Sequence, residues 1–383
     1  MTRFEALSLV ARTLAAQQPD AALADTWRRH ADEWPLVLEM ATGHRVAGAL
    51  FTALESLDLD AELAEPLGDT LRVLRDWARE RNAGIAQQWL GIAAALNRAS
   101  ATPVALKGSG MLLTQLYPDA GDRLIGDIDI LLPRAQQEAA MQELLREGYA
   151  VQNPDLLHED GAPRGDIHYP PLAHPEHALI LELHWRVMPP EFDDVLPPDK
   201  IMKRIAPISL DGGARAAVLG DGDALLYNIL HAEERHHLVA LQNTELFRLL
   251  DTLRLARGMN ADELRETLGR LEHSRHARAL EHHARMAAAL FGTEGLPPPL
   301  QRPVPPRALR RIQNAVNGTR GARLESAARG ITVALGNNGH DILRQWQSPS
   351  RRRALLAKLL RPGSYLRRAR GIARELAVRL RRP

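Results

Sequence analysis

The chain has 383 residues, a formal net charge of +2, and 45% hydrophobic and 25% charged residues, as is typical of a globular protein with a large core. It contains no cysteine, which excludes a disulfide framework and a thiolate metal site, so a metal would need carboxylate or imidazole ligands. No apolar run reaches the ~20 residues of a transmembrane helix, and the N-terminus lacks the apolar stretch of a signal peptide, so we expect a cytoplasmic protein.

Residues 1–98 are predicted to form an N-terminal helical segment, because apolar residues recur there at spacings of three and four. Residues 99–210 are predicted to form a small α/β core with a mixed sheet. Its elements are a strand at 103–106, a helix at 111–117, a strand at 128–132, a helix at 136–147 that ends at Gly148, and antiparallel strands at 166–169 and 178–187. The expected fold class is α+β, with helical segments on both sides of the core.

The C-terminal part of the chain is predicted to be helical on both sides of a stiff linker. Leucine stripes at helical spacing span 211–295, the linker at 296–306 is rich in proline, and 307–383 forms a helical extension. Twelve Lys and Arg residues but one acid fall within 351–383, so this tail carries +11 and the rest of the chain −9. The tail is predicted to contact an anionic membrane or a polyanion peripherally, and a solvated helix is the alternative.

Two acids spaced two residues apart, Asp127 and Asp129, lie at the start of the strand predicted for 128–132. Because strand side chains alternate between faces, both carboxylates lie on one face, where they repel each other unless a cation lies between them. Such oxygen ligands suit Mg²⁺, or Mn²⁺ in its place. Solvated acids at a strand end are the alternative. Neutralising either acid is expected to maintain or raise the melting temperature of the metal-free protein.

A third acid, Glu182, interrupts the otherwise apolar strand predicted for 178–187. It shares one face of that strand with His184, and its burial is costly unless the carboxylate is paired or binds a metal. The alternative is a structural pair with an arginine. His168 is expected to face His184 across the antiparallel strands. A zinc site is not favoured, because the sequence has no cysteine and no two histidines four residues apart.

Gly108 and Ser109 follow the strand predicted for 103–106 and precede a helical pattern. Glycine allows a phosphate to approach the backbone closely, and the serine hydroxyl and free N–H groups can donate hydrogen bonds to it. Lys107 and Arg123 are the candidate cations for the same phosphates. A surface charge or an ion pair with one of the site acids is the alternative for both cations.

These motifs together resemble a poorly characterised bacterial nucleotidyltransferase family within the superfamily that includes polymerase β. The resemblance spans most of residues 35–260 and is carried by Leu106-Lys107-Gly108, Tyr117-Pro118-Asp119, Arg123, Gly126-Asp127-Ile128-Asp129 and Glu182-Leu183-His184-Trp185. Asp127 lies 18 positions after Ser109, farther than is typical of the superfamily. The segment with Tyr117-Pro118-Asp119 and Arg123 fills this gap, as it does in the narrower family.

The resemblance implies an enzyme that uses Mg²⁺, or Mn²⁺, to move a nucleoside monophosphate from a nucleoside triphosphate to an unknown acceptor, with release of pyrophosphate. The acceptor would be a small molecule, a peptide or a protein. The alternative is a catalytically weak binding protein of the same fold that acts as a partner in a biosynthetic or regulatory system.

The same resemblance implies roles for individual residues. Asp127, Asp129 and Glu182 would be catalytic and would hold the metal, and Glu182 would also activate the acceptor. The nucleotide would be bound by Lys107, Gly108, Ser109 and Arg123. The substrate would be contacted by His184, His231 and Asp251. For His231 and Asp251, the alternative is a buried polar pair between helices.

Overall fold

The structure is a computed structural model that describes residues 1–152, 154–156, 167–177, 179–235 and 245–319. The chain divides into two compact units, the first made of residues 1–235 and 245–304 and the second of residues 236–244 and 305–383. In the second unit the described helix is α14 (Pro306–Val316). The predicted basic tail at 351–383 lies outside the described residues. Among the described helices none is long and apolar enough to cross a membrane.

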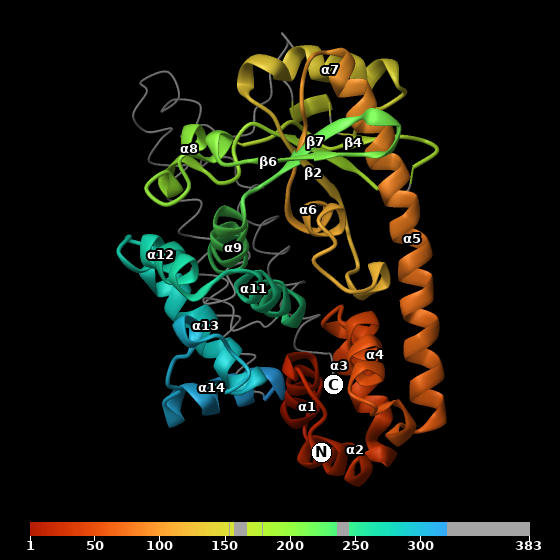
Figure 1. Cartoon of the computed structure of the whole chain (residues 1–383), viewed down its shortest axis with the longest axis vertical. Coiled ribbons are helices and arrows are strands. Elements are labelled where there is room, and N and C mark those ends of the chain that lie inside the picture. The colour runs from red at the N-terminus through yellow and green to blue at the C-terminus, as the bar shows by residue number, and fades with distance from the viewer. Residues whose placement is uncertain (153, 157–166, 178, 236–244, 320–383) are drawn as a thin grey trace, which may run out of the picture. The chain divides into compact units, whose positions relative to one another are not determined.

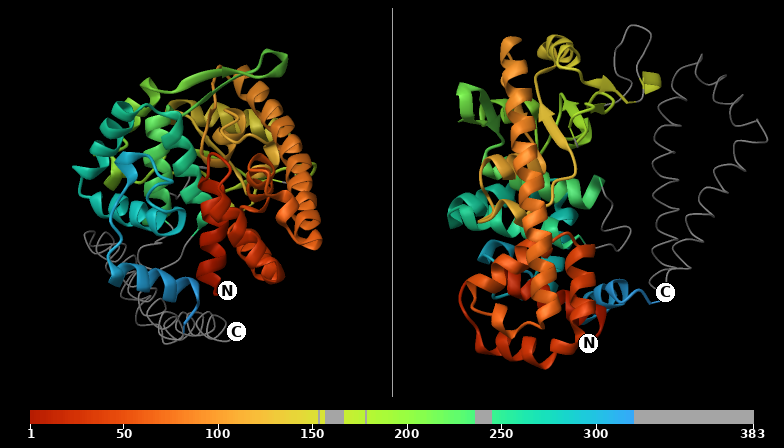
Figure 2. Two further views of the ribbon diagram at one scale, coloured as in Figure 1. Left: turned by 60° about the horizontal axis from the view of Figure 1, so that its bottom comes forward. Right: turned by 90° about the vertical axis from the view of Figure 1, so that its right-hand side faces the viewer.

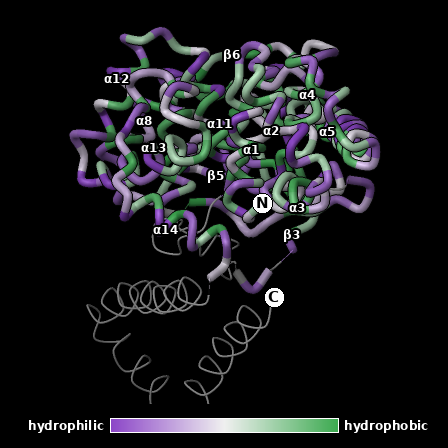
Figure 3. Tube along the Cα trace, turned by 90° about the horizontal axis from the view of Figure 1, so that it is seen from below, coloured by the Kyte–Doolittle hydropathy of each residue, from purple (hydrophilic) through white to green (hydrophobic). Residues whose placement is uncertain are grey.

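The N-terminal part of the first unit is helical, as predicted. Its helices are α1 (Arg3–Ala15), α2 (Ala21–Arg29), α3 (Trp34–Gly43), α4 (Ala47–Ser56) and α5 (Glu65–Arg98), with the 3-10 turns η1 (Ala31–Glu33) and η2 (Asp60–Glu62). Hydrophobic and hydrophilic residues are interleaved along the chain (Figure 3). Each of the helices α1 to α5 buries apolar residues, as amphipathic helices do. The 34-residue helix α5 runs from the other N-terminal helices to the sheet (Figures 1 and 2).

The core of the first unit is a mixed seven-stranded sheet in the order β3-β4-β5-β2-β1-β7-β6, which confirms the α+β class. The strands are β1 (Val104–Ala105), β2 (Ile128–Leu131), β3 (Ala150–Val151), β4 (Leu172–Ala173), β5 (Leu181–His184), β6 (Ala206–Ser209) and β7 (Arg215–Val218). The two central strands β2 and β5 are parallel, and Asp129 lies directly beside Glu182 in their register.

The two faces of the sheet differ because apolar and polar residues alternate along β2 and β5. On one face, Ile128, Ile130, Leu181 and Leu183 pack into a buried cluster with residues of α5 and of α7 (Gln137–Arg146), including Trp89. The side chains between them, including Asp129, lie on the other face. Helices α6 (Lys107–Leu113) and α9 (Asp221–Leu230) lie below the sheet in Figure 1.

Several predicted boundaries are wrong, and all involve short elements. Helix α6 begins at Lys107 and ends at Leu113 rather than spanning 111–117. Strand β7 lies within 211–295, which was predicted to be helical, and β3, β4 and β6 were not predicted. In place of a strand at 166–169, a single antiparallel bridge joins His168 to His184. Elements of two to four residues are too short for a periodic pattern to reveal them.

The C-terminal part of the first unit is otherwise helical. Its elements are η6 (Pro190–Phe192), α8 (Pro198–Lys203), α9, the π-turn η8 (His231–Arg235), α11 (Leu246–Gly258), α12 (Ala261–Glu272), α13 (Ala277–Phe291) and η9 (Pro298–Leu300). The predicted linker at 296–306 belongs to this unit as far as Val304. There Leu296 and Leu300 are buried and η9 contacts α12, since prolines do not prevent apolar neighbours from packing.

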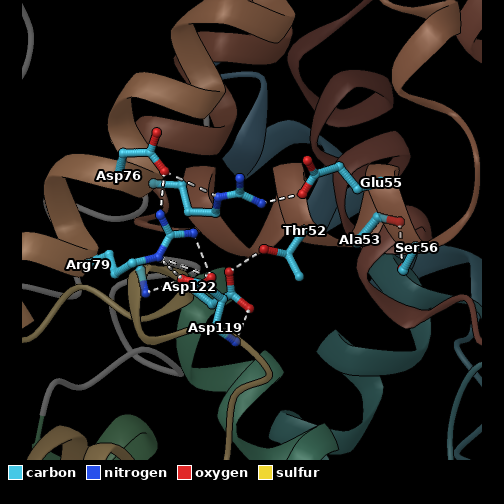
Figure 4. Close-up of polar contacts among 10 residues, drawn as sticks. Thr52, Ala53, Glu55, Ser56, Asp76, Arg79, Asp119 and Asp122 are labelled. Carbon is cyan, nitrogen blue, oxygen red and sulfur yellow. Dashed lines mark hydrogen bonds and ion pairs between the residues drawn. The ribbon is translucent and has the colours of Figure 1, made fainter.

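The segment containing Tyr117-Pro118-Asp119 is fixed against α4 and α5 (Figure 4). It includes the 3-10 turn η3 (Ala120–Asp122), which Asp119 caps through a hydrogen bond from the Gly121 N–H. Asp119 also accepts from Arg79 of α5 at 2.6 Å, and Asp122 accepts from the Thr52 hydroxyl of α4 at 2.6 Å. The extra residues between Ser109 and Asp127 therefore dock the core onto the N-terminal helices.

Two glycines allow this close docking. A Cβ atom on Gly48 would lie 2.1 Å from the Gly121 carbonyl oxygen, and one on Gly121 would lie 2.2 Å from the Arg75 carbonyl oxygen. Both obstacles are backbone atoms, which cannot move aside as a flexible side chain would. The two backbones can therefore approach this closely only without a side chain at either position.

We expect Gly48→Ala and Gly121→Ala to lower the free energy of unfolding by about 1–3 kcal/mol, because the new methyl group overpacks the contact. The matched controls are Gly84→Ala and Gly91→Ala on α5, where a Cβ meets no atom within 4 Å. These controls should raise the free energy of unfolding by about 0.5–1 kcal/mol, because alanine is the better helix former. Urea denaturation measures all four. Equal stability of Gly121→Ala and the wild type would contradict the docking geometry.

Candidate active site

Asp129 is the centre of the candidate site. Its side chain is 1% exposed, and its Oδ1 accepts from Lys107 Nζ at 2.7 Å and lies 2.9 Å from His184 Nε2. Burial alone would raise the pKa of the Asp129 carboxyl, but Lys107 and His184 hold it well below its usual range. The carboxylate is therefore charged and neutralised by two donors on one oxygen.

Glu182 and His184 come from β5 and lie on the same face as Asp129. His184 Nε2 is 3.4 Å from Glu182 Oε2, so this imidazole lies between two carboxylates. The hydrogen bond from His184 lowers the pKa of Glu182. Burial would lower the pKa of His184, but Asp129 and Glu182 raise it. The ring of His168 packs on His184 with centroids 4.8 Å apart, as predicted from the strand pattern.

Asp127 directly precedes β2 and has no partner for its carboxylate among the described residues. Its half-buried position and the negative charge of Asp129 both raise its pKa. Glu182 adds to this repulsion, and Lys107 offsets it in part. Of the three acids predicted for the site, Asp127 is therefore the one whose carboxylate has no ion pair or hydrogen bond among the described residues.

Lys107 occupies a strained position at the start of α6. Its φ of 50° lies in the left-handed region, which is unfavourable for a residue with a side chain. The predicted phosphate-binding neighbours Gly108 and Ser109 are buried, and a Cβ on Gly108 would meet the Ile125 side chain at 3.4 Å. The Ser109 hydroxyl is buried without a hydrogen-bond partner among the described residues.

A pocket extends from Lys107 between α6, α9 and α11. Its lining includes four predicted site residues, Lys107, Arg123, His231 and Asp251. It also includes Tyr227 and Arg248, which were not predicted from the sequence. Gly108 and Ser109 are not among its described lining residues. The signal that could have revealed Tyr227 is its place in the apolar stripe of a predicted helix. A phenol hydroxyl that is buried there needs a polar partner.

Arg123 and Asp251 pair with each other in one wall of this pocket. Arg123 Nε is 3.0 Å from Asp251 Oδ1 and Nη2 is 2.9 Å from Oδ2. The Tyr117 hydroxyl donates to the same carboxylate, and the Arg123 guanidinium lies 4.3 Å from the centroid of the Phe247 ring. The two residues predicted to bind nucleotide and substrate thus join the Tyr117-Pro118-Asp119 segment to α11.

A second buried polar network, also missed from the sequence, supports the turn that carries His231. Glu233 of η8 is 2.8 Å from the Nδ1 atoms of both His282 and His283. The other ring nitrogen of His283 is 2.8 Å from the Thr252 hydroxyl of α11. Burial would raise the pKa of Glu233, but its two histidine partners lower it to about 2. The network ties η8 to α11 and α13.

The acids and His184 can together hold a divalent metal. One ligand atom from each of Asp129, Glu182 and His184 lies within 4.8 Å of the others. The second oxygen of Asp129, Oδ2, is buried without a hydrogen-bond partner in the described structure, so it leaves an acceptor that a cation would satisfy. The two carboxylates suit Mg²⁺ or Mn²⁺, whereas the imidazole of His184 is a ligand more typical of softer transition metals. This cluster contains His184, whereas the predicted metal ligands were the three acids.

Comparison with known families gives one match. A family model described as an uncharacterised nucleotidyltransferase matches residues 30–292 of the chain. The matched span contains every residue of the candidate site and the whole of the sheet. No curated protein matches the chain.

The structure changes the expectation that neutralising either acid should stabilise the metal-free protein. Asp127→Asn should maintain or slightly raise the free energy of unfolding, because it removes an uncompensated charge. Asp129→Asn should lower it by about 3–5 kcal/mol, because it leaves Lys107 and His184 without their shared carboxylate. Chemical denaturation in the presence of EDTA measures the difference. Equal destabilisation by both substitutions would contradict the assigned contacts.

Glu233→Gln should lower the free energy of unfolding by about 2–4 kcal/mol at pH 7. Because the folded pKa is depressed from 4.5 to about 2, the contribution of Glu233 is present above pH 4.5 and is lost as the pH falls toward 2. The difference between variant and wild type should shrink over the same window. Urea denaturation at several pH values checks this, and a difference that does not depend on pH would exclude a charged Glu233.

Proposed function

We propose that this chain, which belongs to the uncharacterised nucleotidyltransferase family, transfers a nucleoside monophosphate from a nucleoside triphosphate to an acceptor hydroxyl or similar nucleophile. The observation that carries this proposal is the position of Asp129 beside Glu182 on adjacent parallel strands, with Asp127 directly before β2 and close enough for the negative charge of Asp129 to raise its pKa. Keeping three like charges close together, one of them buried, costs free energy, and metal-dependent phosphoryl transfer is a reason for keeping them.

The metal would be Mg²⁺ or Mn²⁺, held by Asp129 and Glu182 with His184 and Asp127 beside them. When bound, it would neutralise charge on the phosphates and stabilise the attacking and leaving oxygens. Lys107 is the nearest protein cation, and its ion pair with Asp129 neutralises the site in the metal-free protein. With a nucleotide present, its ammonium group can instead contact a phosphate oxygen.

Glu182 is the base of the proposed reaction. It is partly exposed and its pKa is lowered, so it is ionised at neutral pH and able to accept the proton of the acceptor hydroxyl. In the transfer step the acceptor oxygen bonds to the α-phosphorus while the bond from that phosphorus to the bridging oxygen breaks. The acceptor then carries the nucleoside monophosphate, and pyrophosphate leaves. Arg123, paired with Asp251, lines the same pocket as Lys107.

One observation favours the alternative of a catalytically weak binding protein. Lys107 and His184 already neutralise Asp129, so the metal-free site is electrostatically balanced at that residue. The uncompensated Asp127 favours the enzyme, because a fold used for binding alone gains nothing from a carboxylate without a partner. Turnover distinguishes the two functions.

The test is to incubate the protein with each α-³²P-labelled nucleoside triphosphate, Mg²⁺ and a cell extract, and to identify the labelled product. Asp127→Asn should reduce labelling at least about 100-fold while the protein stays folded, because the variant lacks a carboxylate that would face the metal. Glu182→Gln should reduce turnover with little change in nucleotide affinity, since it acts on the acceptor.

EDTA should also abolish labelling by the wild-type protein, and the folded Asp127→Asn variant provides the matched control for contaminating activity. Tight nucleotide binding without labelled product in any extract would favour the binding protein. Labelling by Asp127→Asn at the wild-type rate would exclude the proposed metal site.

A further inference from the structure

The buried hydroxyl of Tyr227 has no role in the proposed reaction as described above. The residue lies on α9, is 2% exposed, and lines the same pocket as Lys107. Its hydroxyl has no hydrogen-bond partner among the described residues. A buried hydroxyl without a partner costs free energy, so its retention in a pocket wall indicates that a ligand completes it.

The hydroxyl is available as a hydrogen-bond donor at neutral pH. Burial raises the pKa of Tyr227, and the negative charge of Asp129 adds to this effect. Lys107 and Tyr227 both line the pocket, and the positive charge of Lys107 opposes the rise in the pKa of Tyr227. The pocket therefore presents two donors, an ammonium group and a hydroxyl, and the ligand between them must supply acceptors.

The surroundings favour an anionic acceptor. Arg248 and His231 line the same pocket, where Arg248 pairs with Glu245 and lies 3.2 Å from His231 Nδ1. The carboxylate of Asp251 is already engaged by Arg123 and Tyr117. Asp221, which is exposed at the start of α9, is the other acid in the lining. The pocket volume of about 50 Å³ has room for a few water-sized groups, which suits one phosphoryl group rather than a base or a sugar.

We propose that the Tyr227 hydroxyl and the Lys107 ammonium group form a donor pair that binds a phosphate oxygen of the nucleotide and of the pyrophosphate product. This inference rests on the proposed function, because it names the residue that completes the phosphate site beside the acids. Tyr227 lies one helical turn before His231, with their rings 5.4 Å apart. The T-shaped packing of these rings holds the phenol in place.

The test is the affinity of the full chain for pyrophosphate in the presence of Mg²⁺, measured by isothermal titration calorimetry. Tyr227→Phe removes the hydroxyl and keeps the ring, so it should weaken binding by about ten- to a hundredfold, as expected for a lost hydrogen bond to a charged group. Its melting temperature without ligand should equal or exceed that of the wild type, because a buried unpaired hydroxyl is removed.

Tyr149→Phe is the matched control. The Tyr149 hydroxyl is also buried, but it accepts from Gln88 Nε2 at 3.1 Å and is not part of the pocket lining among the described residues. This control should keep the pyrophosphate affinity of the wild type while its melting temperature stays equal or falls.

Each result decides between the two proposals. Equal pyrophosphate affinity of Tyr227→Phe and the wild type would overturn the donor pair and leave the proposed function intact. Weaker binding together with a lower melting temperature would make Tyr227 a structural residue and would also overturn it. A wild-type protein that binds neither pyrophosphate nor any nucleoside triphosphate would overturn both proposals.

Discussion

The structure of the site depends on how the buried charge of Asp129 is compensated. A carboxylate at 1% exposure is stable only with strong partners, and Lys107 and His184 both bind the same oxygen. This requirement explains two features that would otherwise be unfavourable. Lys107 adopts a left-handed backbone at the start of α6, and His184 is buried between two acids. The other oxygen of Asp129 is left for a further cation.

The parallel pairing of β2 and β5 brings these groups together. Its register places Asp129 beside Glu182, although 52 residues separate them in the sequence. The opposite face of the same strands is apolar and is covered by α5 and α7, so a shift by one residue would expose that core and bury the acids. The hydrophobic core therefore determines the geometry of the polar site.

The helical segments complete the site through Arg123 and Asp251. Contacts from α4 and α5 fix the Tyr117-Pro118-Asp119 segment, which carries Tyr117 and Arg123 to Asp251 of α11. The N-terminal helices, the sheet and the helices from α9 to α13 lie in one compact unit, made of residues 1–235 and 245–304. The pocket beside the acids is formed where the core meets α9 and α11, with Tyr227 and His231 in its wall.

The sequence by itself determined the α+β class and the pairing of His168 with His184, because strand alternation acts over neighbouring residues. The short strands β3, β4, β6 and β7 escaped prediction because their few residues carry no period. Only the tertiary structure decided that Lys107 and His184 neutralise Asp129, that Arg123 pairs with Asp251, and that the Tyr227 hydroxyl lies buried beside them. These contacts join residues far apart in the chain, and their geometry follows from how the helices pack on the sheet rather than from any local pattern.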